Sequence, residues 1–348
     1  MGFEDSLREV AFAFVRFFSF TAHAALFGIP VICLLVLRPV FASLVDDEIW
    51  SGGRGRLGLR LEGAVRAAMI GSVVATVVGI VLQAILVATL NEVEVSSSSF
   101  GSVFRTSFGQ WYVFRFPLLA GLYVLLGGQI ARWALARGGA GRMWWIGWIV
   151  LAAGLLSTST FTGHAAVASP RWAGLVNDFV HLAAGSIWFA GIVMLAVFLP
   201  DAWRGRTEPE RLALLAPVVI RFSQVALISI AIVAATGVLN SLFNVAHFGD
   251  LFGAAYGLTL TFKLLLFAGV LAMGAVNHFV LRDRMARAVR GGPATVAHVT
   301  FRRTIAIELT IAVAIMGATG WLTGQAKTRQ AGSEAPVVET EVSGGSTP

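Results

Sequence analysis

Apolar residues in this chain are gathered into eight long runs separated by short polar stretches. Each run is close to the ~20 residues that an α-helix needs to cross a bilayer. Inside lipid the backbone must satisfy its own hydrogen bonds, which a helix does within one segment. No series of short alternating strands is present. The pattern therefore predicts an all-α, polytopic membrane protein with eight transmembrane helices, at residues 12–37, 62–90, 112–131, 144–161, 173–199, 217–243, 257–281 and 304–323.

Composition agrees with a membrane protein and excludes several other classes. Hydrophobic residues make up 57% of the 348 residues and charged residues only 13%, whereas soluble domains carry about 25% charged residues. The net charge is +7, and the basic residues lie in short loops between the runs. This distribution reflects membrane topology, so no nucleic-acid partner is expected. The single cysteine, Cys33, excludes a disulfide framework and a CxxC metal motif. No nucleophile-plus-base set or phosphate-binding glycine loop is visible, so we do not expect an enzyme.

Basic residues are divided unevenly between alternate loops, which predicts the orientation. Sixteen Arg residues lie in the loops after the first, third, fifth and seventh runs, and five Arg or Lys residues lie on the other side. Loops rich in Arg and Lys stay in the cytoplasm, so both termini are predicted to lie outside the plasma membrane. The first run is too long for a signal peptide and is expected to remain a helix. Residues 1–327 form the predicted membrane domain, and the Gly-, Ser- and Glu-rich segment 328–348 is a predicted disordered outer tail.

Two segments of the chain resemble each other and suggest an internal duplication. In FGQWYVFRFPLLAGLYVLLGG (108–128) and YGLTLTFKLLLFAGVLAMGAV (256–276), a basic residue follows an aromatic-Gly pair by six positions. Arg115 thus aligns with Lys263, and the first and fifth runs each carry a histidine. These features predict two four-helix repeats, at 10–161 and 172–323. Four crossings is an even number, so the copies would keep one orientation.

Ionisable side chains recur in the predicted outer halves of the runs, where each costs about 2.5–3.5 kcal/mol to insert. With a rise of 1.5 Å per residue, His23 lies roughly 10 Å and His181 roughly 13 Å below the outer ends of their helices. Lys263 lies roughly 9 Å deep, and Asn240 falls in the same band. Lys263 and Arg115 could instead extend along their helices to the membrane surface.

The fifth run combines a histidine and a carboxylate at helical spacing. Asp178, His181, Gly185 and Trp188 share one face of a helix. Asp178 could bond one ring nitrogen of His181 and leave the other free for a metal, or it could pair with Lys263. Imidazole suits copper, zinc, iron and nickel. The predicted metal ligands are His23, His164 and His181, with Asp178, Lys263, Asn240 and Trp188 as their neighbours or charge partners.

Three segments carry a resemblance to a known family. STFTGHA (159–165), the helix pattern D-x-x-H-L-A-A-G-x-x-W-x-x-G (178–191) and KLLLFAGVLAMGAVNHFVLR (263–282) resemble the copper resistance protein D family. The resemblance implies a prokaryotic inner-membrane copper transport protein, often working with an extracytoplasmic chaperone of the CopC type. It also implies that copper-binding histidines fall on His23, His164 and His181.

Three hypotheses follow for the function. The leading one is copper transport across the plasma membrane, inward, with His164 capturing copper and His23 and His181 receiving it. A second is a haem b electron-transfer protein in which His23 and His181 are the axial ligands. A third is a membrane scaffold whose histidines only pack. The direction of transport, the copper oxidation state and the oligomeric state stay open.

Overall fold

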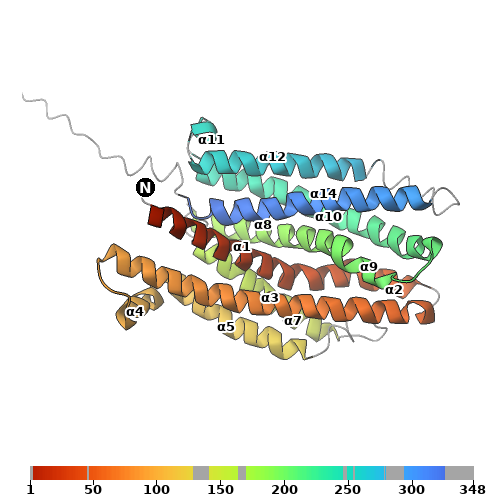
Figure 1. Cartoon of the computed structure of the whole chain (residues 1–348), viewed down its shortest axis with the longest axis horizontal. Coiled ribbons are helices and arrows are strands. Elements are labelled where there is room, and N and C mark those ends of the chain that lie inside the picture. The colour runs from red at the N-terminus through yellow and green to blue at the C-terminus, as the bar shows by residue number, and fades with distance from the viewer. Residues whose placement is uncertain are drawn as a thin grey trace, which may run out of the picture.

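The computed structural model describes residues 3–44, 47–127, 141–163, 170–245, 249–253, 255–277, 279 and 294–325. Every regular element in these residues is a helix, and the long helices run side by side in one bundle (Figure 1). The first half contains α1 (Phe3–Ile32), η1 (Cys33–Leu37), α2 (Arg38–Ser43), α3 (Asp47–Leu90), α4 (Ser97–Arg105), α5 (Ser107–Leu126) and α7 (Arg142–Thr162). The second half contains α8 (Arg171–Val193), η3 (Met194–Phe198), α9 (Leu199–Ala202), α10 (Glu208–Asn244), α11 (Asp250–Gly253), α12 (Ala255–Val276) and α14 (Ala294–Leu322).

Seven helical segments among the described residues are long and apolar enough to cross a membrane. They confirm a multi-pass, all-helical membrane protein, and they are Ser6–Ser43, Trp50–Leu90, Arg142–Thr162, Arg171–Ala202, Glu208–Phe243, Ala255–Val276 and Val299–Leu322. The remaining predicted crossing overlaps α5, which is helical but carries Gln110, Arg115 and Pro117 and is not among the seven. The number of eight crossings and the orientation therefore stay predictions.

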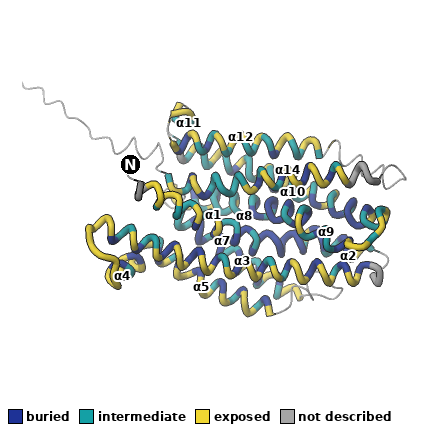
Figure 2. The backbone as a smooth tube through the Cα atoms, in the orientation of Figure 1, coloured by how far each residue is buried: buried dark blue, intermediate teal, exposed yellow. Residues whose placement is uncertain are grey.

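Helix α1 lies at the centre of the bundle, where it packs against α3, α7, α8 and α14. Its crossing with α8 requires a glycine, because a Cβ at Gly28 would lie 2.3 Å from the carbonyl oxygen of Ser186. The main core cluster includes Leu26 of α1, Leu57 of α3, Trp148 of α7 and Ile192 of α8, each fully buried. Burial is greatest along these inner helices, while α12 presents many exposed positions (Figure 2).

The two halves share several local features. Helix α1 pairs with α3 as α8 pairs with α10, and α5 pairs with α7 as α12 pairs with α14. Both α1 and α8 pass into a five-residue π-helical segment, and the helix that follows has a proline in its first turn. Gly109 at the start of α5 lies against the carbonyl of Val103, and Gly257 in α12 lies against that of Asp250. A duplication would produce such matches, and the repeat boundaries stay a prediction.

Candidate metal site and two buried polar clusters

His181 on α8 is held by a threonine of the neighbouring helix α10. Its ring nitrogen Nδ1 lies 2.9 Å from Oγ1 of Thr236. That hydroxyl also lies 2.6 Å from the carbonyl oxygen of Ile232, to which it donates its proton. Because the hydroxyl proton is committed to Ile232, Nδ1 must donate to Thr236, and the neutral ring keeps its lone pair on Nε2. His181 also forms a hydrogen bond with the backbone of Val233, one turn before Thr236 on α10. We infer that Nδ1 faces this turn and makes both contacts, so that Nε2 is the nitrogen that could bind a metal.

Amide and charged groups surround His181 and complete what we call the α8–α10 cluster, namely Asn177, Asp178, His181, Thr236, Asn240 and Lys263. The amide of Asn177 donates to the carbonyl oxygen of Thr236 at 3.0 Å and to Oδ1 of Asn240 at 2.8 Å. Lys263 of α12 interacts electrostatically with both Asp178 and His181. The cluster therefore draws on three helices of the second half of the chain.

His23 on α1 belongs to a different cluster, formed with α3 and α7. Its Nδ1 lies 3.1 Å from Oγ of Ser159, and its Nε2 lies 3.0 Å from Oγ of Ser72. The side chain is fully buried, with 0% of its surface exposed. Both ring nitrogens therefore already have hydroxyl partners, and a metal bound at His23 would have to displace one serine.

Arg115 of α5 interacts electrostatically with His23 and is buried. We call His23, Ser72, Ser159 and Arg115 the first-half cluster. Arg115 is only 2% exposed, so the expectation that it extends along its helix to the surface was wrong. Its Nε donates to Oγ1 of Thr158 at 2.9 Å and its Nη1 to Oγ of Ser19 at 3.2 Å. The guanidinium carbon lies 3.9 Å from the centre of the Tyr112 ring, a cation–π contact. Neighbouring hydroxyls and an aromatic face stabilise the cation where no described carboxylate pairs with it.

The two histidines lie on helices in contact, but their rings are turned away from the shared surface. Helices α1 and α8 meet at Gly28 and Ser186. His23 precedes Gly28 by five residues, and His181 precedes Ser186 by five. Five residues correspond to a rotation of about 140° on an α-helix. Each ring therefore faces its own half of the bundle, in agreement with its hydroxyl partners. One haem held between both rings would require at least one of them to give up its present partners.

The predicted site residues thus lie in different parts of the bundle. The structure brings Asp178, His181, Asn240 and Lys263 together, and it separates His23 from them. Trp188 is buried in the main core cluster. His164 lies outside the described residues. Among the residues that are described, no group of three or more His, Cys, Asp or Glu side chains could hold a metal ion.

Sequence reasoning predicted Asn240 but missed Asn177 and the hydroxyl residues that bond the two histidines. The sequence suggested that Asp178 could bond one ring nitrogen of His181, whereas Nδ1 is bonded to Thr236. Hydroxyl residues in membrane helices commonly bond their own backbone, as Thr76 does to the carbonyl of Ser72. Their presence alone therefore gives no sign of a site. The run STST at 157–160 was the available signal, because consecutive hydroxyl residues are unusual in an apolar helix.

Comparisons with known proteins match most of the chain to one family. The model for the N-terminal domain of copper resistance protein D-like proteins matches residues 7–175, and the model for copper resistance protein D matches residues 216–322. Over 144 residues, 41% of this chain, the sequence is 37% identical to the copper transport protein CutJ of Bacillus subtilis. Over 171 residues, 48% of this chain, it is 30% identical to the copper resistance protein D of Pseudomonas syringae pv. tomato. The matched segments span 26% and 54% of those two proteins. No solved structure matches the chain.

Proposed function

Because the chain belongs to the copper resistance protein D family, we propose that it carries copper across the plasma membrane, inward, through a site centred on His181. Copper is the cargo, and no catalytic step is part of the proposal. Both termini would lie outside, in keeping with the distribution of Arg and Lys between the loops. The outer end of the bundle is defined from here on as the end at which α1 and α8 begin.

The observation that carries the proposal is the hydrogen bond between Nδ1 of His181 and Thr236, from which we infer the tautomer of the ring. A ring whose Nδ1 is bound by Thr236 and whose Nε2 carries the lone pair is prepared for a metal. Imidazole nitrogen is a good ligand for copper. Asn177 and Asn240 supply further polar groups from α8 and α10. The site therefore offers nitrogen and oxygen donors in the predicted outer half of the membrane.

The charged groups of the α8–α10 cluster suggest which of them would attract or repel a bound copper ion. A copper ion at His181 would be repelled by the ammonium of Lys263 and attracted by the carboxylate of Asp178. The two opposite charges compensate each other before copper arrives. We propose that Asp178 turns from Lys263 toward the copper ion when it is bound. The ammonium of Lys263 is then the uncompensated charge, and it opposes tight copper binding.

His164 and His23 have more distant parts in the proposal. His164, which precedes α8 in the sequence, would capture copper at the outer end. His23 would bind copper only after losing a serine partner, which makes it a second and weaker ligand. An extracytoplasmic chaperone of the CopC type would deliver copper to His164.

Copper uptake by cells that express single variants tests the proposal. Cells with His181→Ala should accumulate copper at the level of the empty vector. His298→Ala, in the first turns of α14, serves as the matched control and should resemble the parent. Elemental analysis of each purified protein reports whether copper is bound at all. The proposal fails if His181→Ala accumulates and binds copper as the parent does.

The same assay separates the parts of the other two histidines. His164→Ala should slow uptake at low external copper and approach the parent at high copper, since capture is bypassed by mass action. His23→Ala should reduce uptake less than His181→Ala does. If His23→Ala alone abolishes uptake while the variant remains folded, the first-half cluster carries copper and the order proposed here is wrong.

A further inference from the structure

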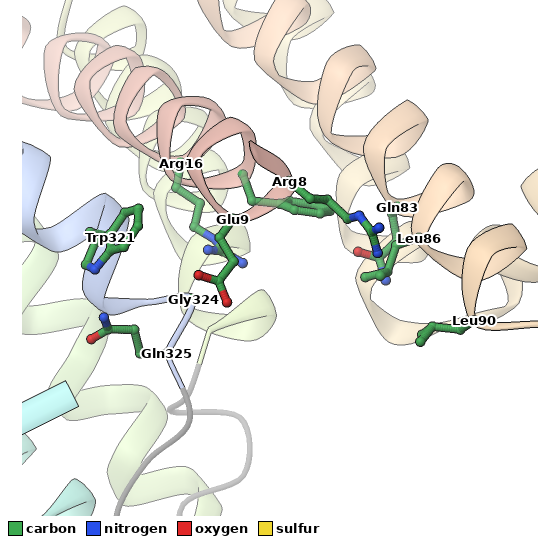
Figure 3. A pocket seen from close by; sticks show the side chains of 10 residues that line it. Arg8, Glu9, Arg16, Gln83, Leu86, Leu90, Trp321, Gly324 and Gln325 are labelled. Atoms are coloured by element: carbon green, nitrogen blue, oxygen red, sulfur yellow. The ribbon is translucent and has the colours of Figure 1, made fainter. Parts of the chain in front are cut away.

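A second polar site lies at the outer end of the bundle, next to the cluster of His23 and Arg115, since Arg16 interacts electrostatically with Tyr112. It is a cavity of about 420 Å³ between α1, α3 and the end of α14 (Figure 3). Its polar lining includes Arg8, Glu9 and Arg16 of α1, Gln83 of α3 and Gln325 beyond α14. Phe12, Leu86, Leu90 and Trp321 form its apolar lining. The cavity thus combines two guanidinium groups with an apolar wall.

Arg16 is the residue that points to a ligand. Within the described residues its guanidinium forms no hydrogen bond or ion pair, and its aromatic contact is with the Phe12 ring at 5.5 Å. A Cβ at Gly324 would lie 2.2 Å from its Nη1, so the guanidinium rests directly on the backbone there. A guanidinium has five N–H donors, and those of Arg16 have no acceptor among the described residues. An oxyanion in the cavity would supply one.

Arg8, Phe12 and Arg16 recur at intervals of four residues, so they share one face of α1. Arg8, Glu9 and Arg16 carry the charges of the lining. The guanidinium of Arg16 disfavours a metal cation and favours a singly charged oxyanion, to which arginine can donate two parallel hydrogen bonds.

The apolar wall decides which oxyanion fits. Leu86 and Leu90 follow each other on α3, and Leu90 is 73% exposed. Trp321, on the opposite wall, is a residue type that favours the membrane–water interface. We propose that this cavity binds the phosphodiester of an anionic phospholipid, with Arg16 holding the phosphate and Leu86 and Leu90 contacting the start of an acyl chain.

Native mass spectrometry of the full chain in detergent tests the proposal, with phosphatidylglycerol and inorganic phosphate added in separate samples. The parent should retain phosphatidylglycerol, and Arg16→Gln should bind it roughly tenfold more weakly because a charge-assisted hydrogen bond is lost. Arg171→Gln is the matched control, since Arg171 is an exposed arginine at the same end of the bundle, and it should bind the lipid as the parent does.

Two further measurements separate lipid binding from phosphate binding and show whether each variant is folded. Leu86→Ser should weaken lipid binding while leaving any phosphate binding unchanged. Thermal unfolding of each variant in detergent shows whether it is folded, so a loss of lipid in a folded Arg16→Gln supports the site. The proposal is overturned if Arg16→Gln and Arg171→Gln retain phosphatidylglycerol equally. It is also overturned if the parent binds inorganic phosphate as tightly as it binds the lipid.

Discussion

The tautomer of His181 can be tested through Thr236, which touches no metal in the proposed site. Thr236→Val keeps the size and branching of the side chain and removes only the hydroxyl. The proton on Nδ1 of His181 then loses the acceptor that lies 2.9 Å away in the parent. With that acceptor gone, the ring can rotate or move its proton to Nε2, the nitrogen proposed to bind copper.

The size of the effect follows from the hydrogen bonds of Thr236. A buried donor left without its acceptor costs about 1–3 kcal/mol. Thr236 is 8% exposed, so water replaces the hydroxyl poorly. Loss of a group that orients a metal-binding histidine typically lowers metal affinity by roughly 10- to 100-fold. We therefore expect Thr236→Val to bind copper roughly 10- to 100-fold more weakly than the parent.

The measurement is copper affinity of the purified protein by competition with a chelator of known affinity, followed by thermal unfolding of the same sample. Thr236→Ser keeps the hydroxyl and should retain an affinity within about threefold of the parent, a difference worth less than 1 kcal/mol. Thr310→Val is a second control, because Thr310 bonds only its own helix and is exposed. Copper affinity in Thr236→Val equal to that in Thr236→Ser would refute the assignment of the tautomer.

Two other predictions concern the packing of the bundle. Gly28→Ala should lower the thermal unfolding temperature, because its Cβ would lie 2.3 Å from the carbonyl oxygen of Ser186 and overpacking costs about 1–3 kcal/mol. Gly71→Ala, where nothing lies within 4 Å, should leave the unfolding temperature within a degree or two of the parent, and equal melting of the two variants would contradict the close helix crossing. Asp201→Asn removes the 2.9 Å ion pair with Arg60, an exposed residue, so we expect at most about 1 kcal/mol of destabilisation in chemical unfolding. A loss of several kcal/mol would instead mean that this contact between the halves is essential for folding.

Much of the fold could be predicted from the chain alone because lipid imposes simple rules. An apolar run of membrane length must be a helix, so the predicted runs coincide with long helices in the structure. The predicted run over α5 contains Arg115, and the structure explains this arginine by burying it among hydroxyls. The spacing of Asp178 and His181 likewise predicted one helix face, and both residues lie in the α8–α10 cluster.

The sequence by itself determined which segments are helices and which residues share a face on each of them, because helical periodicity is a local property of the chain. Only the tertiary structure decided which neighbour each face meets. His23 is bonded to serines 49 and 136 residues away, whereas His181 is bonded to a threonine 55 residues away. The close crossing at Gly28 and Ser186 sets the rotation of α1 against α8 and turns the two rings apart. Periodicity within one helix carries no information about that rotation, which depends on packing between helices distant in sequence.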